Sequence, residues 1–188
     1  NYRTDLRARS LRTGRTHTLA FVVADISSPV AGIMASAADE RAYADHYSLV
    51  LYNTHDDLAR EEFSIDSILQ RAVDGVMCVS ARDQSTALAK LESAGIRTVV
   101  IDRVPSDYTG PAVVLDNIAA GTLAAEHLLE LGHRRCAHIG GPGDTHIARE
   151  RLQGLRNALL KQGAPEPLVQ LADDWHLASG YEAMRRML

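Results

Sequence analysis

The chain of 188 residues contains only two cysteines, and nowhere does it reach the roughly 20 consecutive apolar residues of a membrane helix. Cys78 and Cys136 each lie within an apolar run, so we expect buried thiols in a reducing compartment and no disulfide framework. The first 16 residues are polar and basic, so we expect no secretory signal before the first strand. Internal repeats and low-complexity segments are also absent. These features indicate a globular cytoplasmic protein of one large or two small domains, without membrane contact.

Signatures of common enzymes are missing as well. The glycines of Gly140-Gly141-Pro142-Gly143 lack the spacing of the dinucleotide fingerprint, and the chain has neither a P-loop nor a Gly-x-Ser-x-Gly elbow. His133, Cys136 and His138 could suggest a metal site. However, His133 falls in a turn whereas the other two follow a strand pattern, so we expect no metal. The sequence therefore predicts neither an enzyme nor a bound cofactor.

Charge is distributed unevenly along the chain. The formal net charge is −4, yet residues 1–16 contain five arginines and one aspartate and carry +4, so the rest carries −8. A basic arm on an acidic body favours contact with a polyanion through the arm alone. The alternative is a solvated tail.

Apolar strands and amphipathic helices alternate from residue 17 onward. Strands that are apolar on both faces predict a parallel sheet covered by helices. Ser28-Pro29 and Asp116 mark helix starts. The helix after Asp116 is expected to bury one face, formed by four residues between positions 121 and 131. We expect strands at 17–24, 47–52, 75–79, 97–101, 112–115, 135–139 and 168–171, helices at 84–94, 148–162 and 180–188 among others, and a buried face of Gly121, Ala124, Leu128 and Leu131.

Only two strands follow residue 134, and a two-stranded sheet is marginal by itself. We therefore expect the partner strands of this second region to lie beyond Leu188 or to come from elsewhere.

Polar residues gather where the expected strands end. Ligands of parallel sheets bind beyond the carboxyl ends of the strands. A carboxylate accepts hydrogen bonds from hydroxyl groups, an arginine donates them and an indole packs on a ring, so these ends suit a polyhydroxylated or heterocyclic ligand. The alternative is that strand ends are polar because loops are exposed. The residues at these ends are Asp25, Asn53, Ser80, Asp102-Arg103, Gly140 to Gly143, and Asp173-Asp174-Trp175.

A series of short motifs along the whole chain resembles the regulatory part of LacI/GalR-type transcription regulators. Each motif is weak alone, but together and in this order they are specific. They are Asn1-Tyr2 with Ala8 to Thr16, Asp25-Ile26-Ser27-Ser28-Pro29, Val73-Asp74-Gly75, Ile101-Asp102-Arg103, Val114-Leu115-Asp116-Asn117, Leu131 to Arg135, Gly140-Gly141-Pro142, Glu150 to Gly154, and Ser179-Gly180-Tyr181.

The resemblance implies an α/β fold of the periplasmic-binding-protein-like type I, with two lobes that are each a parallel sheet flanked by helices. Residues 1–16 would be a hinge to a helix-turn-helix domain that is absent here. Residues 17–116 would form the first lobe and 117–188 an incomplete second lobe, so the chain is expected to be a fragment cut at both ends.

The resemblance also assigns roles in the hinge. Leu11 matches a leucine that wedges between base steps in the minor groove, and Arg9 and Arg12 would lie near the DNA backbone. The alternative for Leu11 is packing onto the core. Thr4 stands where the family often has proline, which fixes the start of the hinge helix less firmly.

The same resemblance assigns effector residues. Asp102 would accept hydrogen bonds from sugar hydroxyls, Arg151 would hold the effector from the second lobe, and Trp175 would stack on it. Asp25 and the small Val30 would border the same interlobe site. A lobe-internal salt bridge is the alternative for Arg151, and a further acidic ligand is expected outside this chain. The expected effector is a sugar or sugar derivative, with a purine as the alternative.

Together these inferences predict a homodimeric, ligand-responsive transcription repressor whose operator DNA is bound through the hinge and the missing domain. One alternative is the solute-binding protein of a sugar transporter, which would lack the basic hinge. The other is a sugar- or nucleotide-processing α/β enzyme with Asp25 and Asp102 as its acid–base pair.

Overall fold

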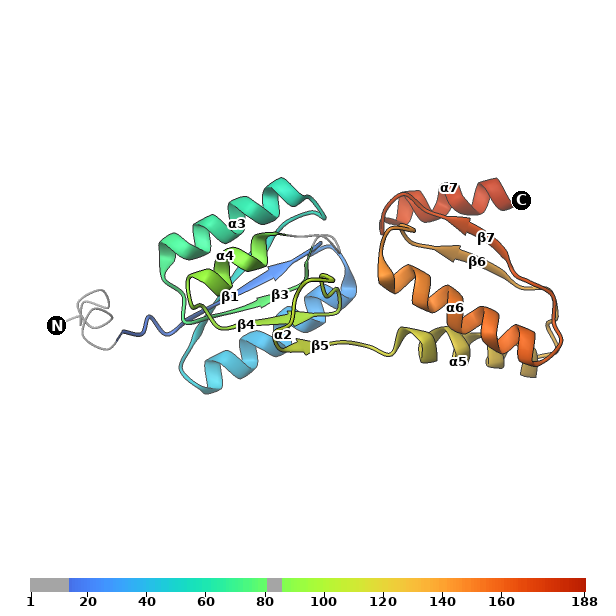
Figure 1. The fold of residues 1–188 in the computed structure, drawn as a ribbon, viewed down its shortest axis with the longest axis horizontal. Helices are drawn as coiled ribbons and strands as arrows, with labels where there is room; N and C mark the ends of the chain where they lie inside the picture. The colour runs from blue at the N-terminus through green and yellow to red at the C-terminus, as the bar shows by residue number, and fades with distance from the viewer. Residues whose placement is uncertain (1–13, 81–85) are drawn as a thin grey trace. The chain divides into compact units, whose positions relative to one another are not determined.

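The computed structural model describes residues 14–80 and 86–188 and divides the chain into two compact units (Figure 1). Unit 1 comprises Asn1–Val114 and unit 2 comprises Leu115–Leu188, and each unit is described by itself. The hinge residues Leu11, Arg9 and Arg12, together with Thr4, lie outside the described residues.

Unit 1 is a five-stranded parallel sheet covered by helices on both faces (Figure 1). The strand order is β2-β1-β3-β4-β5, so β1 and β3 lie inside the sheet as neighbours. The elements are β1 (Thr18–Val23), α2 (Pro29–Ala44), β2 (Ser48–Asn53), α3 (Leu58–Arg71), β3 (Gly75–Cys78), α4 (Ala87–Ser93), β4 (Thr98–Ile101) and β5 (Ala112–Val113).

Burial explains why the strands of unit 1 are apolar on both faces. Successive residues of a strand point to opposite sides. Ala20 and Val22 of β1 pack in the cluster under α3 and α4, whereas Phe21 and Val23 pack on the side of α2. All four side chains are fully buried. The predicted strand and helix positions in unit 1 are thus confirmed, with two exceptions: the strand expected at 112–115 extends only over Ala112–Val113, and part of the 84–94 helix falls in the undescribed segment.

The helix starts follow the expected residues. Pro29 is the first residue of α2, and Ser28 occupies the N-cap position, although its hydroxyl makes no capping bond within the described part of the chain. Asp57 caps α3, because its Oδ1 accepts the Arg60 N–H at 2.8 Å. α3 ends at Arg71, and the C-cap residue Ala72 has a left-handed φ of +51°.

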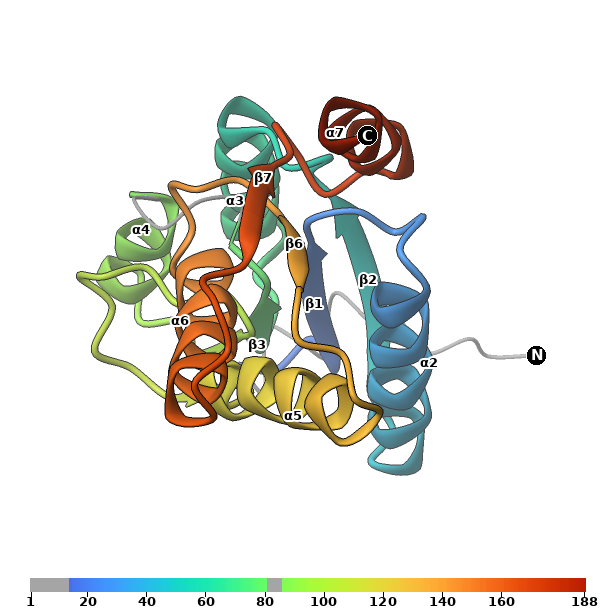
Figure 2. The same ribbon diagram turned by 90° about the vertical axis from the view of Figure 1, so that its right-hand side faces the viewer.

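Unit 2 is a helix pair packed on a two-stranded parallel sheet. In Figures 1 and 2 the strands lie between α7 and the pair α5–α6. Asp116 caps α5 as predicted, since its Oδ1 accepts the Ala119 N–H at 2.8 Å. The elements are α5 (Asn117–Glu130), β6 (Ala137–Gly140), α6 (His146–Lys161), β7 (Leu168–Leu171) and α7 (Leu177–Met187).

Two expectations for unit 2 were wrong. The buried face of α5 is formed by Gly121 and Ala125, whereas Ala124 and Leu131 are exposed, because α6 packs along the row that contains Gly121. α7 begins at Leu177 and not at Gly180, which lies inside the helix.

The expected α/β fold is confirmed by the parallel sheet of unit 1 and its helical layers. In the described residues, no helix combines the length and the apolar character needed to span a bilayer.

Candidate functional site

Asp102 forms a tight turn at the carboxyl end of β4. Its φ is +65°, and the N–H of Arg103 donates to the carbonyl oxygen of Ile101 at 2.8 Å, which closes a γ-turn around it. The N–H of Asp102 donates to the Val113 carbonyl at 2.8 Å and so ties the turn to β5. A non-glycine residue in this region costs roughly 1–3 kcal/mol and persists where its surroundings fix it, often at functional sites. The structure therefore holds Asp102, the first of the predicted effector-binding residues, in a fixed position at the sheet edge.

A buried ion pair supports this turn. Arg103 Nη1 lies 2.6 Å from Asp56 Oδ1, and the two side chains are only 8% and 14% exposed. Asp56 follows β2, has a φ of +57°, and donates its N–H to the Ala24 carbonyl at 2.9 Å. The pair thus joins the loop after β2, the end of β1 and the turn after β4. The sequence analysis did not predict this ion pair, although the arginine directly after Asp102 indicated that a carboxylate partner was needed.

Polar groups also lie beneath this edge. Glu61 of α3 is fully buried, and Ser80 donates its hydroxyl to Glu61 Oε2 at 3.4 Å. Burial strongly raises the pKa of the neighbouring Cys78 thiol, Glu61 raises it further and Arg103 lowers it. Cys78 is therefore a protonated, inert thiol, as predicted, whereas Cys136 is only partly buried.

Asp25 and Val30 lie at the same edge, after β1. Both carboxylate oxygens of Asp25 accept hydrogen bonds from Ser27, at 2.9 Å from its N–H and 2.6 Å from its hydroxyl. Asn53 Oδ1 accepts the N–H of Ile26 at 3.3 Å, which joins this loop to the end of β2. Asp25 thus shapes the loop, and Val30 follows in the first turn of α2 with 62% of its surface exposed.

In unit 2, Trp175 covers the glycine run that follows β6. A Cβ placed on Gly141 would lie 2.4 Å from Trp175 Cη2, and a Cβ on Gly143 would lie 2.8 Å from a methyl carbon of Leu171. Close packing of the indole ring therefore leaves no room for a side chain at Gly141, whereas at Gly143 the end of the Leu171 side chain would have to shift. Trp175 itself remains 39% exposed and can offer part of its indole to a ligand.

Arg151 of α6 is oriented by a buried asparagine. Its Nε donates to Asn117 Oδ1 at 3.0 Å, and Asn117 Nδ2 donates to the Leu115 carbonyl and to Glu150 Oε2, both at 3.3 Å. Asn117 is only 2% exposed. Within the described residues Arg151 makes no ion pair, and the bond to Asn117 engages Nε and not the terminal fork of the guanidinium. Asn117 is a second positioning residue that the sequence reading missed, although it belongs to a motif quoted for the resemblance.

His138 lies on β6, with its Nε2 buried and without a hydrogen-bond partner among the described residues. Burial lowers the pKa of His138 below 6.5, and the charges of Arg156 and Arg151 lower it further. The folded state thus favours the neutral ring, so the free energy of unfolding should fall as the pH drops below about 6.5, by less than about 1.4 kcal/mol per pH unit. Urea titrations between pH 7.5 and 5.0 would measure this.

The His138→Gln variant should lose this component of the pH dependence, whereas His127→Gln, at an exposed position on α5, should keep it. Equal pH profiles of wild type and His138→Gln would contradict the assignment. No group of three or more His, Cys, Asp or Glu side chains able to hold a metal occurs in residues 14–80 and 86–188.

The predicted site residues thus occupy two places. Asp25, Val30 and Asp102 lie at the carboxyl edge of the unit 1 sheet, with Asp56 and Arg103 beneath them. Arg151 and Trp175 belong to unit 2. Arg151 lies on α6, which follows β6, and Trp175 lies in the loop between β7 and α7.

A family model and several curated relatives match this chain. The family model "Periplasmic binding proteins and sugar binding domain of LacI family" matches residues 16–188. The ribose operon repressor of Escherichia coli strain K12 is 30% identical over the whole chain, which spans 58% of that repressor. The transcriptional regulator DegA of Bacillus subtilis strain 168 is 31% identical over the whole chain and is covered to 57%. The chain thus spans somewhat more than half the length of these relatives.

Solved structures show the same fold. The Cra regulator of Pseudomonas putida in complex with fructose 1-phosphate superposes with a TM-score of 0.84 at 22% identity, covering 91% of this chain and 63% of that one. A complex of the transcriptional regulator CelR with cellobiose superposes with a TM-score of 0.78 at 28% identity, covering 97% and 59%. With the match over residues 16–188, the chain belongs to the family of periplasmic binding proteins and LacI-type sugar-binding domains.

Proposed function

We propose that this chain is the effector-binding part of a ligand-responsive transcription repressor and that its effector is a sugar or sugar derivative. The observation that carries the proposal is the γ-turn at Asp102, which holds a carboxylate at the carboxyl edge of the sheet at a conformational cost. The names of the relatives support a sugar, since they include a ribose operon repressor and regulators in complex with fructose 1-phosphate and cellobiose. A purine is the second candidate, because the relatives also include PurR repressors that are 26–27% identical to this chain.

Each site residue has a role in this proposal. Asp102 accepts hydrogen bonds from sugar hydroxyls, and the terminal nitrogens of Arg151 donate hydrogen bonds to the ligand. Trp175 packs its exposed indole on the sugar ring, and Val30 borders the site with a small apolar surface. Asp25 acts by shaping the loop after β1, because both its carboxylate oxygens are already engaged by Ser27.

The basic segment of residues 1–16 distinguishes a repressor from the transport protein of the same fold. Its five arginines would contact operator DNA in the cytoplasm, with Arg9 and Arg12 near phosphates and Leu11 inserted between base steps. Ile33 of α2 is 70% exposed and offers an apolar surface to a second copy of the chain. We propose a homodimer on this basis.

A thermal-shift screen with D-ribose, fructose 1-phosphate, cellobiose and hypoxanthine tests the proposal. A ligand at 100 times its Kd stabilises the folded state by about 2.7 kcal/mol, which raises Tm by roughly 5–10 °C for a protein of this size. In Asp102→Asn the turn is retained, since asparagine tolerates positive φ, but the charge is lost. We expect Asp102→Asn to weaken binding of the effective sugar roughly 10- to 100-fold.

Asp107→Asn, in the exposed loop beyond the turn, is the matched control and should bind like the wild type. Trp175→Leu should also weaken binding through loss of the stacking surface. A sugar that shifts Tm equally in wild type and Asp102→Asn would place the binding site elsewhere. A shift with hypoxanthine alone would replace the sugar by a purine.

A further inference from the structure

The carboxylate of Asp74 binds the chain at the point where the basic N-terminal segment joins the sheet. Oδ1 accepts the N–H of Thr16 at 2.8 Å and its hydroxyl at 3.0 Å, and Oδ2 accepts the N–H of His17 at 3.0 Å. The N–H of Asp74 donates to the Thr18 carbonyl at 2.9 Å. One residue, directly before β3, is thus bonded to three consecutive residues at the start of β1.

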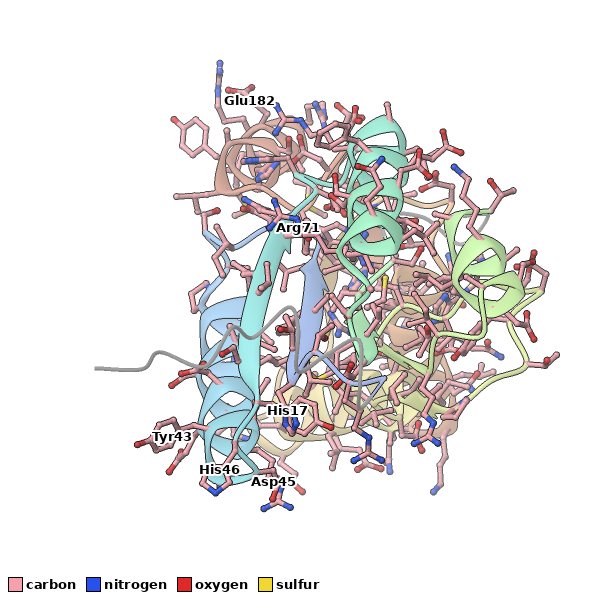
Figure 3. All side chains as sticks on the ribbon, turned by 90° about the vertical axis from the view of Figure 1, so that its left-hand side faces the viewer. His17, Tyr43, Asp45, His46, Arg71 and Glu182 are labelled. Carbon is pink, nitrogen blue, oxygen red and sulfur yellow. The ribbon has the colours of Figure 1, made fainter. Side chains whose placement is uncertain are left out.

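His17 is fixed from a second direction. Its φ of +52° is left-handed, a conformation that a residue with a side chain keeps only where its surroundings hold it. Its carbonyl accepts the N–H of Ser48 at 2.9 Å, and its ring lies 5.2 Å from that of Tyr47. Figure 3 looks onto this end of unit 1 and labels His17 as well as Tyr43, Asp45 and His46. Both backbone polar groups of His17 and its ring are therefore engaged by the sheet.

The anchor sits on the two neighbouring strands inside the sheet. β1 and β3 are paired in parallel from Leu19 opposite Gly75 to Val22 opposite Cys78. Both strands start at the anchor and end at the edge where Asp25 and Ser80 lie. The root of the basic segment is thus bonded to strands whose other ends carry the candidate effector site.

We infer that Asp74 is a positioning residue that fixes the root of the basic segment to unit 1 and thereby sets where its arginines meet a nucleic-acid duplex. The anchoring itself stands on the hydrogen bonds above, whereas the part that concerns DNA rests on the proposed function. Arg15 is exposed and directly precedes Thr16, so it is the arginine of the basic segment that is nearest to the anchor in sequence.

Amide hydrogen exchange measured by NMR tests the anchoring without effector or DNA. In Asp74→Ala all three acceptor bonds are lost, whereas the amide of Asp74→Asn offers a single acceptor oxygen. Since hydrogen bonds to charged groups are the stronger kind, the amides of Thr16 and His17 should exchange roughly 10- to 100-fold faster in Asp74→Ala. In Asp74→Asn, at least one of these two amides should also exchange faster than in the wild type. The amides of Phe21 and Val22 should keep their wild-type rates.

Asp45→Asn is the matched control, because Asp45 is an exposed carboxylate at the same end of unit 1, paired with Arg41. It should leave the amides of Thr16 and His17 unchanged. Wild-type exchange at both amides in Asp74→Ala would overturn the inference. So would equal acceleration at Phe21 and Val22, since that would show general destabilisation of the sheet.

Fluorescence anisotropy of a labelled 30-base-pair duplex at low salt tests the role in DNA binding on the same chains. We expect Asp74→Asn to bind about 3- to 10-fold more weakly than the wild type, because Thr16 and His17 at the root of the segment are no longer held in place on the sheet. Equal affinities, with the amides released, would overturn the positioning role. If the wild type does not bind the duplex, the proposed contact of the segment with DNA fails, and the DNA part of this inference fails with it. The exchange data would still decide the anchoring.

Discussion

Gly154→Ala is expected to destabilise unit 2 by about 3 kcal/mol or more, the upper range for overpacking a close contact. A Cβ on Gly154 would lie 2.0 Å from the carbonyl oxygen of Ile118, and one on Gly121 would lie 2.0 Å from that of Arg151. Because the obstructing atoms belong to the backbone, the clash can be relieved only by moving α5 and α6 apart. That movement would also break the bond from Thr122 Oγ1 to the Gly154 carbonyl, 3.2 Å long.

Urea unfolding followed by the fluorescence of Trp175, in unit 2, would measure this loss. Gly180→Ala is the matched control, because Gly180 lies inside α7 with nothing within 4 Å of an added Cβ. Alanine should stabilise that helix by up to about 1 kcal/mol. Gly121→Ala combined with Gly154→Ala should cost less than the sum of the single changes, since one separation of the helices relieves both clashes. An unchanged midpoint for Gly154→Ala would refute the close crossing.

Asp56→Asn should destabilise unit 1 by about 3–5 kcal/mol, the usual cost of removing one partner of a buried ion pair. Arg103 is only 7% exposed, so its buried charge loses the carboxylate of Asp56, which lies in direct contact with it. Asparagine accepts the positive φ of Asp56, which leaves the change of charge as the main cause. Calorimetric melting would record the loss, and binding of the effective sugar should weaken with it because Arg103 supports the turn at Asp102.

Asp66→Asn provides the comparison for this ion pair. Asp66 lies 3.0 Å from Lys90, but both side chains are about half exposed, so water and salt screen the pair and little change is expected. Replacing both buried charges, with Asp56→Asn and Arg103→Met together, should recover much of the loss from Asp56→Asn alone. If Asp56→Asn melts like Asp66→Asn, the buried pair does not stabilise unit 1.

Local patterns were sufficient to predict the elements of this fold, because periodicity and caps act within a few residues. Asp116 before an apolar helix and Ser28-Pro29 before another were such signals. Contacts between distant segments could not be read in this way. The bonds of Asp74 to Thr16 span 58 positions and depend on the pairing of β1 with β3. The buried face of α5 was misjudged because it depends on where α6 crosses, which the pattern of α5 alone does not contain.

The same distinction applies to the site. The position of Asp102 at a strand end followed from the apolar run before it. The position of Trp175 followed in the same way from the apolar run Leu168–Leu171. The left-handed turn at Asp102 had only a weak local signal, since aspartate tolerates this conformation but does not require it. Asn117 became recognisable only once α5 and α6 were seen to place it against Arg151.

The backbone at Asp102 also restricts how this protein could evolve a new specificity. At a φ of +65°, glycine, asparagine and aspartate are tolerated, whereas valine, isoleucine and threonine are strongly disfavoured. Most single replacements at this position would therefore destabilise the folded state, whatever their effect on sugar recognition. Val30 is under no such restriction, because it lies in the first turn of a helix with most of its surface exposed. Adaptation to a different sugar should thus accumulate at positions like Val30 while the residue in the turn stays the same.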